Sequence, residues 1–325
     1  GRRAGLRGPA TITPLPALVA HAARTARLAR RLGAEVIHTS SMRAHVYGLL
    51  AGRMARIPVV AHIRDDLSDL GTGPGLAAVV RALLRRLPAA VVGCSAGALE
   101  SAGIGPRRAT VVYSGVPLAA VVAAGSERRE PGEPADAGVA VVGMVARIAP
   151  WKGQHVFLEA AEAMARRRPD VRFRIVGAPL FGEEGYLHRL ERLAGQEPLA
   201  GRVEFTGFIA DPTAEYDRMT VAVACSVKPE PFGQVVVEAM ARGRAVVAPA
   251  EGGPAEVITS GTDGLLVRPR DPAALAEGVL ALLDDAGLRR RLGANAAETV
   301  RARFTVEATA EHFAAVLRQV TGRAA

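Results

Sequence analysis

The chain has 325 residues, of which 49% are hydrophobic and only 4% are aromatic, and its formal net charge is +9. No apolar run approaches the ~20 residues that a membrane-spanning helix needs, so we expect a soluble globular protein. The length predicts two domains of about 150 residues each.

The positive charge is confined to the first part of the chain. Residues 1–135 carry 18 Arg and 8 acidic residues, a net charge of +10, and the remainder carries −1. A basic half can face nucleic acid, anionic lipid or a phosphorylated substrate. Because no zinc finger or aromatic-interleaved basic segment is present, we predict no nucleic-acid partner. An anionic or membrane-associated acceptor, contacted by the first predicted helix, and a merely solvated basic face are equally good interpretations; the oligomeric state stays open.

The cysteines and the chain start bear on the compartment. Cys94 and Cys225 each end an apolar run, with no CxxC spacing and no ligand cluster nearby. We therefore predict buried thiols in a reducing compartment, the cytoplasm, with possible peripheral association at the inner membrane surface. The chain starts at Gly1 without the apolar core of a signal peptide, and we expect that it is a fragment lacking its true N-terminus.

Helices and strands alternate in the first half, which predicts a parallel sheet with helices on both faces. A helix ends at Gly33, and Ser95 is the expected N-cap of a later helix. The predicted strands are 35–40, 58–63, 89–94 and 109–115, and the other predicted helices are 43–55 and 74–86.

A second alternation follows a linker that is rich in Pro, Gly and charge. Its strands are near-continuous apolar runs, as a sheet covered on both faces requires. They are predicted at 139–146, 171–176, 202–206, 220–225, 244–248 and 264–267, before helices at 271–284, 286–302 and 305–320. The predicted organisation is a first domain at 1–116, a linker at 117–137, a second domain at 138–303, and a C-terminal helix at 304–325 that packs back toward the first domain.

Charged residues follow the strand at 139–146 in the segment "RIAPWKG". Ligands of doubly wound sheets bind beyond the carboxyl ends of strands, where loops lead into helix N-termini. Arg147 and Lys152 lie in such a loop, before a helix that begins near Gly153, and two cations beside a helix N-terminus suit a diphosphate. A solvated loop of ordinary basic residues is the alternative. Only 2 of the 41 basic residues are Lys, which makes Lys152 mildly informative.

The strand at 220–225 is followed by "SVKPEPFGQVVVEAMARG". Pro229 and Pro231 hold Glu230 in extended loop backbone, because proline fixes φ and disfavours helix in the residue before it. A helix is predicted from about Phe232 or Gly233, and it places Glu238 on the same face as Gln234. Its expected buried stripe is Val235, Val236, Ala239 and Met240.

Two other interpretations of nearby residues remain open. Taken alone, two glutamates around three valines are better explained as a strand with two surface acids. In "AEGGPAEVI", Gly252 and Gly253 could form either a structural turn or a backbone contact to a ligand.

The segment at 229–243 resembles the E-x7-E motif of retaining glycosyltransferases of family 4. This family has the GT-B fold, an α/β fold of two facing Rossmann-like doubly wound domains. The resemblance continues in the family's order through "GMVARIAPWKGQHVFLEAA", "FRIVGAPL", "RVEFTGF", "PEPFGQVVVEAMARGRAVVAPAEGGPAEVI" and "GTDGLLVRPRDPAALA". The first half resembles the family more loosely, through "EVIHTSSMRAHVYGLLAGRMARIPVVAHIRD" and "VVYSGV". The family's first strand and Gly-rich loop have no counterpart before residue 15, which predicts an N-terminally truncated first domain.

The resemblance implies a role for each matching residue. Glu230 would contact hydroxyls of the transferred sugar, and Glu238 would bind the ribose hydroxyls. Arg147 and Lys152 would hold the diphosphate leaving group. His62 would face the cleft near the sugar, a hydrogen-bonded structural histidine being the alternative. Backbone contacts to the sugar or phosphate are implied for Phe232, Gly233 and Gln234. Contacts around the base are implied for Gly177, Phe208 and Ile209.

The implied activity is transfer of a sugar from a nucleotide-diphosphate donor to a hydroxyl acceptor with retention of configuration. No metal and no cofactor are expected, because Arg147 and Lys152 would neutralise the leaving group. The alternatives are a hydrolysing nucleotide-sugar epimerase of the same fold and a non-catalytic nucleotide-sugar binding fragment.

Overall fold

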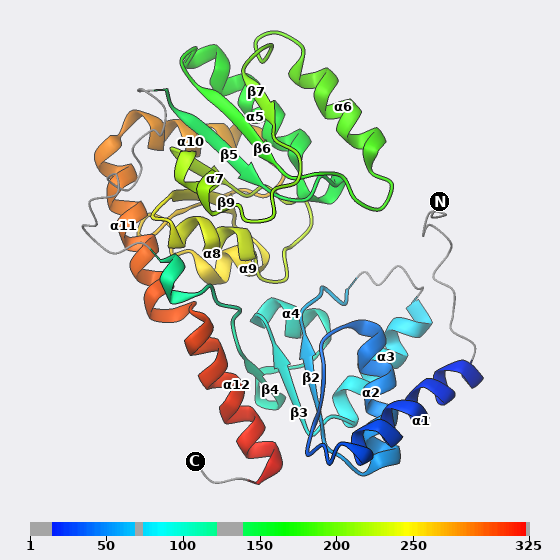
Figure 1. Cartoon of the computed structure of the whole chain (residues 1–325). Helices are drawn as coiled ribbons and strands as arrows, with labels where there is room; N and C mark the ends of the chain where they lie inside the picture. Colours follow the sequence, from blue (N-terminus) through cyan, green and yellow to red (C-terminus); the bar gives the residue numbers. More distant parts are fainter. Residues whose placement is uncertain (1–14, 69–73, 122–138, 323–325) are drawn as a thin grey trace. The chain divides into compact units, whose positions relative to one another are not determined.

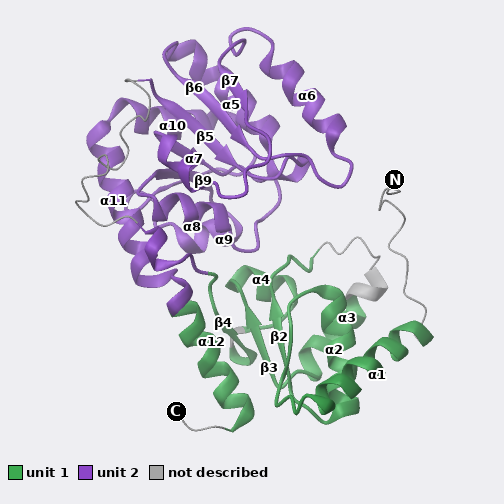
Figure 2. Ribbon diagram, in the orientation of Figure 1, with its two compact units in different colours: residues 1–114, 308–325 green, residues 115–307 purple. Residues whose placement is uncertain are grey.

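A computed structural model describes residues 15–68, 74–121 and 139–322 of the chain (Figure 1). The chain divides into two compact units, residues 1–114 with 308–325, and residues 115–307 (Figure 2). Of the predicted linker, residues 122–137 lie outside the described residues. Each unit contains one parallel sheet with helices packed on it, which confirms the predicted α/β class.

Unit 1 contains a four-stranded parallel sheet of order β1-β2-β3-β4. The central strands are apolar and buried, because helices cover both of their faces. The strands are β1 (Ile37–Thr39), β2 (Val59–Ile63), β3 (Ala90–Gly93) and β4 (Ala109–Val111), and the helices are α1 (Leu15–Arg31), α2 (Met42–Ala55), α3 (Pro74–Arg86) and α4 (Ala96–Ser101). As predicted, Ser95 caps α4, and its side chain accepts a hydrogen bond from the Ala98 backbone N–H.

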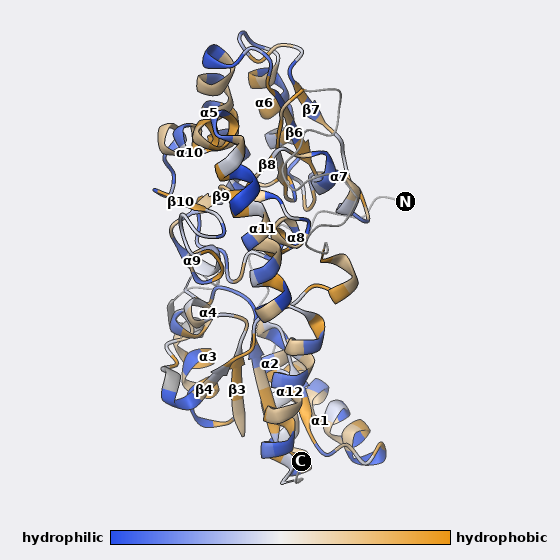
Figure 3. Cartoon of the chain, turned by 90° about the vertical axis from the view of Figure 1, so that its left-hand side faces the viewer, coloured by the Kyte–Doolittle hydropathy of each residue, from blue (hydrophilic) through white to orange (hydrophobic). Residues whose placement is uncertain are grey.

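The last helix, α12 (Val306–Thr321), supplies apolar side chains to the core of unit 1. Val316 is 4% exposed and clusters with Val60, Val92 and Val112 of the sheet. The ribbon of α12 carries both hydrophobic and hydrophilic stretches in Figure 3, as an amphipathic helix does. The core of unit 1 is therefore formed by segments that lie far apart in the sequence.

Unit 2 contains a six-stranded parallel sheet of order β10-β9-β8-β5-β6-β7. Its core includes Phe157 and Met164 of α5, Phe173 of β6 and Leu280 of α10. The strands are β5 (Val141–Val145), β6 (Arg172–Val176), β7 (Val203–Phe205), β8 (Val221–Val223), β9 (Ala245–Pro249) and β10 (Leu265–Val267). The helices are α5 (Gln154–Arg167), α6 (Glu184–Ala194), α7 (Thr213–Arg218), α8 (Gln234–Ala241), α9 (Gly252–Val257), α10 (Pro272–Asp284) and α11 (Ala286–Arg303).

The strand order of unit 2 reverses beside β5. The chain proceeds from β5 outward to β6 and β7, and then returns to place β8 on the other side of β5. Neighbouring loops at such a reversal leave in opposite directions, which opens a crevice at the carboxyl ends of the strands. The loops after β5 and β8 are therefore the expected position of a ligand.

One detail of the predicted α8 is wrong. Val235 is only half-buried, whereas Val237 is fully buried and belongs to the apolar face instead. Because α8 is covered by α11, by β9 and by α7, its buried surface is wider than a single stripe. The three valines between the two glutamates lie in a helix and not in a strand.

Candidate functional site

The loops after β5 and β8 meet through a buried ion pair. Lys152 Nζ lies 2.5 Å from Glu230 Oε1, and the side chains are 16% and 10% exposed. The two residues are 78 positions apart in sequence, and the parallel pairing of β5 with β8 brings their loops together. The structure thus brings together the predicted cation of the first motif and the predicted carboxylate of the second.

Two further side chains complete the surroundings of this ion pair. The Ser226 hydroxyl, three residues after the end of β8, donates a hydrogen bond to Glu230 Oε1. The Trp151 ring lies under the ammonium group, with Lys152 Nζ 4.1 Å from its centroid. Charge-assisted hydrogen bonds and a cation–π contact keep both charges in place in a position that water reaches poorly.

Gly153 allows the loop after β5 to turn into α5. Its φ is +78°, and a Cβ there would lie 1.9 Å from the Cys225 carbonyl oxygen. The Gln154 side chain, 0% exposed, donates a 2.8 Å hydrogen bond to the Arg147 carbonyl oxygen. Backbone geometry and one buried amide therefore fix the two ends of the loop that carries both predicted cations.

Arg147 lies between an acid and an aromatic ring. Its Nη1 is 3.9 Å from Glu183 Oε2, and its guanidinium carbon is 5.1 Å from the centroid of Phe181. Glu183 Oε2 is buried and has no hydrogen-bond partner among the described residues. The Arg147 side chain is 28% exposed, so its guanidinium remains accessible to a ligand from solvent.

Glu238 lies on α8 and accepts a 2.8 Å hydrogen bond from the Tyr216 hydroxyl through Oε2. Burial raises the pKa of Glu238, and hydrogen bonds from Tyr216 and Gln234 partly oppose this shift. Burial also raises the pKa of Tyr216 well above its usual value, so this phenol stays a neutral donor. Gln234 contacts Glu238, which confirms that they share one helix face.

The start of α8 depends on glycines that let two backbones approach. Gly233 is the N-cap, with φ +88°. A Cβ on Gly253 would lie 2.1 Å from the Phe232 carbonyl oxygen, and Gly253 donates its N–H to the Glu230 carbonyl oxygen at 2.8 Å. These contacts favour a structural role for Gly253. Phe232 is 6% exposed and packs against Phe304, with the ring centroids 6.0 Å apart.

The residues predicted to surround the base lie on the loops after β6 and β7. Gly177 and Gly207 form an isolated bridge, with Gly177 N donating to Gly207 O at 3.0 Å. A Cβ on Gly177 would lie 2.0 Å from the Ala146 carbonyl oxygen, so only glycine fits. Phe208 is 75% exposed, while Ile209 is half-buried.

His62 belongs to unit 1, where it lies on β2. Its ring centroid is 5.5 Å from that of His38 and 5.6 Å from that of Phe313. Burial, with smaller contributions from Arg64, His38 and His45, lowers the pKa of His62 to about 4. It is therefore neutral near pH 7, and its buried Nε2 has no partner among the described residues.

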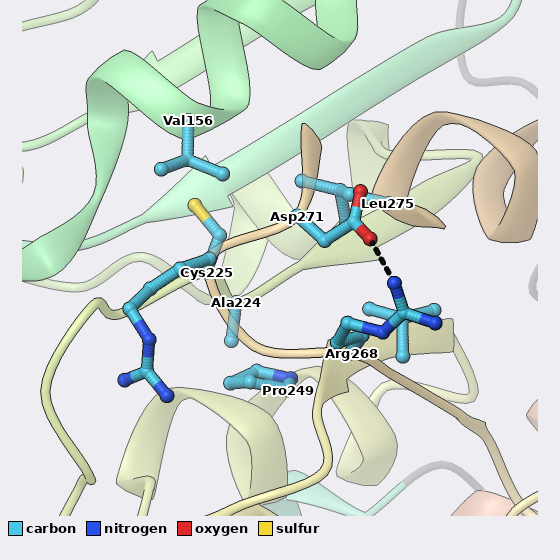
Figure 4. A pocket seen from close by; sticks show the side chains of 9 residues that line it. Val156, Ala224, Cys225, Pro249, Arg268, Asp271 and Leu275 are labelled. Atoms are coloured by element: carbon cyan, nitrogen blue, oxygen red, sulfur yellow. Dashed lines mark hydrogen bonds and ion pairs between the residues drawn. The ribbon is translucent and has the colours of Figure 1, made fainter. Parts of the chain in front are cut away.

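A small cavity of about 10 Å³ lies in unit 2, between α5 and the ends of β8, β9 and β10 (Figure 4). Figure 4 shows Cys225 and Val156 facing it, and Arg268 paired with Asp271 at 3.3 Å. This volume holds roughly one water molecule, which excludes it as a sugar site.

The sequence did not single out Ser226, Tyr216 or Glu183. Ser226 directly follows the predicted strand at 220–225, and the reasoning that selected Arg147 and Lys152 could have selected it. Tyr216 reaches Glu238 from α7 across 22 residues, a contact that no local pattern encodes. Glu183 reaches Arg147 from the loop that precedes α6, a contact equally invisible in the sequence.

The described residues were searched for metal-binding groups and for membrane-spanning helices. Within residues 15–68, 74–121 and 139–322, no group of three or more His, Cys, Asp or Glu is arranged to hold a metal ion. In the same ranges, no helix has the length and apolar character required to cross a bilayer.

Two family models match the chain. The family model described as "Glycosyl transferases group 1" matches residues 126–299, and that described as "Glycosyltransferase Family 4" matches residues 2–120. A D-inositol 3-phosphate glycosyltransferase of Thermobispora bispora is 36% identical over 227 residues, 67% of this chain and 52% of the relative. An alpha-D-kanosaminyltransferase of Streptomyces kanamyceticus is 32% identical over 181 residues, 55% of this chain and 46% of the relative. The chain thus spans about half the length of the curated relatives it matches.

The fold also matches solved structures. The crystal structure of Anabaena Alr3699/HepE in complex with UDP has a TM-score of 0.83 and 29% sequence identity, over 92% of this chain and 82% of that one. The same protein has been solved with UDP-glucose, with a TM-score of 0.79 and 28% identity, over 92% and 82% of the two chains.

Proposed function

Because the chain belongs to the glycosyl transferases of group 1, we propose that it moves a sugar from a nucleotide-diphosphate donor to a hydroxyl acceptor, with retention of configuration and without a metal. In this proposal, unit 2 binds the donor, and the basic unit 1 serves the acceptor. The observation that carries the proposal is the ion pair of Lys152 and Glu230 at the strand reversal of unit 2. It joins a group suited to phosphate to a group suited to sugar hydroxyls.

The chemistry of the proposed reaction fits these residues. Departure of a nucleoside diphosphate builds negative charge on the leaving oxygen and positive charge at the anomeric carbon. Lys152 and Arg147 would stabilise the leaving group, and Glu230 would hold the sugar. Glu238 would accept hydrogen bonds from the ribose. In a retaining reaction of this kind, the acceptor attacks on the face from which the phosphate departs, and the phosphate takes its proton.

The donor nucleotide in this proposal is UDP. The support is the likeness to Anabaena Alr3699/HepE, whose structures contain UDP and UDP-glucose. Glycine backbone around Gly177 and the exposed Phe208 ring would face the base, where a flat ring can stack.

The acceptor in this proposal is anionic or lies at the inner surface of the cytoplasmic membrane. The support is the net charge of +10 over residues 1–135 and the basic helix α1, which ends with Arg30 and Arg31. Arg30 donates hydrogen bonds to the carbonyl oxygens of Met54 and Ala55, so the other arginines of α1 are better placed to meet an anion. If the fraction of protein that co-sediments with liposomes does not depend on anionic lipid content or on salt, the membrane version is rejected.

Calorimetry with UDP tests the proposed site most directly. Lys152→Ala and Glu238→Ala should each weaken UDP binding about 10- to 100-fold, because each removes a charged hydrogen-bonding group worth about 1.5–3 kcal/mol. Arg166→Ala and Glu298→Ala likewise remove one positive and one negative charge, from exposed helix positions of unit 2, and should leave the affinity unchanged. Unaltered affinity in both site variants would reject the assignment.

Product analysis separates the proposed transfer from its rivals. Retention predicts that the glycoside keeps the anomeric configuration of the donor sugar, as read by NMR coupling constants. Turnover that survives EDTA supports the metal-independent reaction, whereas turnover lost to EDTA and restored by a divalent cation contradicts it. An epimerised nucleotide sugar formed from donor alone would indicate an epimerase. Binding of UDP without turnover of any donor would indicate a binding module.

A further inference from the structure

The Glu230 carboxylate receives two hydrogen bonds on one of its oxygens. Lys152 Nζ donates to Oε1 at 2.5 Å, and the Ser226 hydroxyl donates to the same oxygen. Ser226 is 3% exposed, so its hydroxyl is held inside the protein and not shared with bulk water. The two donors differ in kind, because one carries a charge on a long flexible chain and the other is a short neutral group.

Glu230 is held by backbone contacts, namely its flanking prolines and the Gly253 N–H that donates to its carbonyl oxygen, but these contacts do not fix its carboxylate. It lies in the loop between β8 and α8, and no helix or strand includes it. Ser226 lies in the same loop, three residues after β8. It directly follows the buried Ala224 and Cys225, and the Ala224 N–H donates to the Val247 carbonyl oxygen of β9 at 3.0 Å. The serine hydroxyl therefore ties the Glu230 side chain to a buried segment whose preceding residues are still hydrogen-bonded to the sheet.

Donor binding changes the balance between the two contacts. In the function proposed above, Lys152 binds the diphosphate, so a doubly charged ligand competes with Glu230 for one ammonium group. Glu230 then shares or loses its charged donor at the moment when it must hold the sugar. The Ser226 hydroxyl has no charge to give to phosphate and remains on Oε1.

We propose that Ser226 is a positioning residue for Glu230, which keeps this carboxylate in place when Lys152 turns to the diphosphate. The inference rests on the proposed function. Within that function, Lys152 serves the diphosphate, and Ser226 keeps Glu230 in position for the sugar. Loss of the serine hydroxyl should harm recognition of the sugar and spare recognition of the nucleoside diphosphate.

The binding test compares UDP with UDP-glucose by calorimetry. Ser226→Ala should leave the Kd of UDP within twofold and raise the Kd of UDP-glucose about tenfold, the usual effect of one hydrogen bond to a charged group. Ser226→Cys, which keeps the size of the side chain and a weak donor, should lie between alanine and wild type. Ser260→Ala removes an exposed hydroxyl of the same unit, which accepts from Leu266 N, and should change neither value.

The outcomes distinguish positioning from a general structural role. Equal losses for UDP and UDP-glucose, or a lowered melting temperature that accounts for both, would overturn the proposal. Unchanged binding of both probes in Ser226→Ala would overturn it as well. If the wild type binds neither probe, the proposed UDP-dependent function fails, and the ligand-free measurement below still decides the role of Ser226.

The ligand-free test uses the scarcity of lysine. The chain contains only Lys152 and Lys228, so lysine labelled with ¹³C at Cε gives two NMR signals, which Lys228→Arg assigns. Ser226→Ala should displace the Lys152 signal, because the loosened Glu230 carboxylate no longer holds the ammonium in one position, and Ser260→Ala should not. A Lys152 signal that is the same in wild type and Ser226→Ala would show that the serine does not position Glu230.

Discussion

The side chains of Tyr216 and Glu238 form a buried pair in which a neutral phenol supports a carboxylate. Their hydrogen bond of 2.8 Å lowers the pKa of Glu238, while burial raises it by more. A carboxylate that must accept hydrogen bonds from ribose has to be ionised. The Tyr216 hydrogen bond therefore extends toward lower pH the range in which Glu238 is ionised and can act in the proposed site.

Tyr216→Phe should shift the pH dependence of UDP binding. Without the phenol hydroxyl, burial acts on Glu238 with less opposition, so its pKa rises further and affinity should begin to fall at a higher pH than in wild type. Calorimetric Kd values between pH 5 and 8 measure the midpoint. Tyr186→Phe removes a hydroxyl that contacts His155 and should leave this midpoint in place. A downward shift, or none, in Tyr216→Phe would contradict the assigned hydrogen bond.

Elements α8 and α9 depend on the approach of two backbones at Gly253. Gly253→Ala would bring a Cβ to 2.1 Å from the Phe232 carbonyl oxygen, so the turn that carries Glu230 has to move. We expect a loss of about 1–3 kcal/mol in the free energy of unfolding, as for an overpacked core position, and weaker UDP-glucose binding. Denaturant melts and calorimetry measure the two effects.

Gly185 of α6 offers the matched control for this substitution. It is exposed, a Cβ there meets nothing within 4 Å, and its position is helical. Gly185→Ala should stabilise the protein by about 0.5–1 kcal/mol, because alanine has the lower entropic cost in a helix. If both variants lose stability equally, the close contact at Gly253 is not the cause.

The elements themselves were largely predictable from the sequence. Strands such as β2 and β5 are short apolar runs between turn residues. Their side chains are buried because helices cover both faces of the sheet. The predicted bounds of α10 and α11 lie within one residue of the observed ones, and in the structure Asp271 and Asp285 cap these helices through their side chains. Local chemistry is enough where a cap or an apolar run decides the structure.

The candidate site was predictable only in part. Arg147, Lys152 and Glu230 each follow a strand, and the topology of a doubly wound sheet places them at one edge. The partners Tyr216 and Glu183 were not predictable, because their contacts depend on how α7 and the loop before α6 pack in three dimensions. The predicted buried stripe of α8 was wrong at Val235 for the same reason. Several neighbouring elements contact this helix, and they bury more of its surface than a period of 3.6 indicates.

At the scale of the whole molecule, the buried histidines are concentrated in unit 1. The pKa of His45 is lowered to about 4, chiefly by burial and then by His38, and that of His62 is lowered to the same value. The unfolded chain titrates near 6.5, so between pH 4 and 6.5 it binds more protons than the folded chain. The contribution of these two histidines to the free energy of unfolding is therefore complete above pH 6.5, and it is lost as the pH drops toward 4.

Thermal melts from pH 7.5 to 4.5 should show this loss. The wild-type melting temperature should decrease steeply below pH 6.5, and His45→Leu, which removes one buried titrating group, should decrease less steeply even if it is less stable at pH 7.5. His188→Leu, at an exposed position of unit 2, should keep the wild-type slope. A slope that is unaffected in His45→Leu would contradict the buried neutral state of this histidine.

The contact between Lys152 and Trp151 gives the protein a built-in optical reporter. Trp151 is the only tryptophan in the chain, and its ring lies 4.1 Å from the ammonium that the diphosphate is proposed to attract. Displacement of a charge over an indole changes its emission, so all intrinsic fluorescence of the indole type comes from the edge of this site. Stopped-flow mixing with UDP can consequently time the exchange of partners at Lys152 in unlabelled protein, with Lys152→Ala as the silent reference.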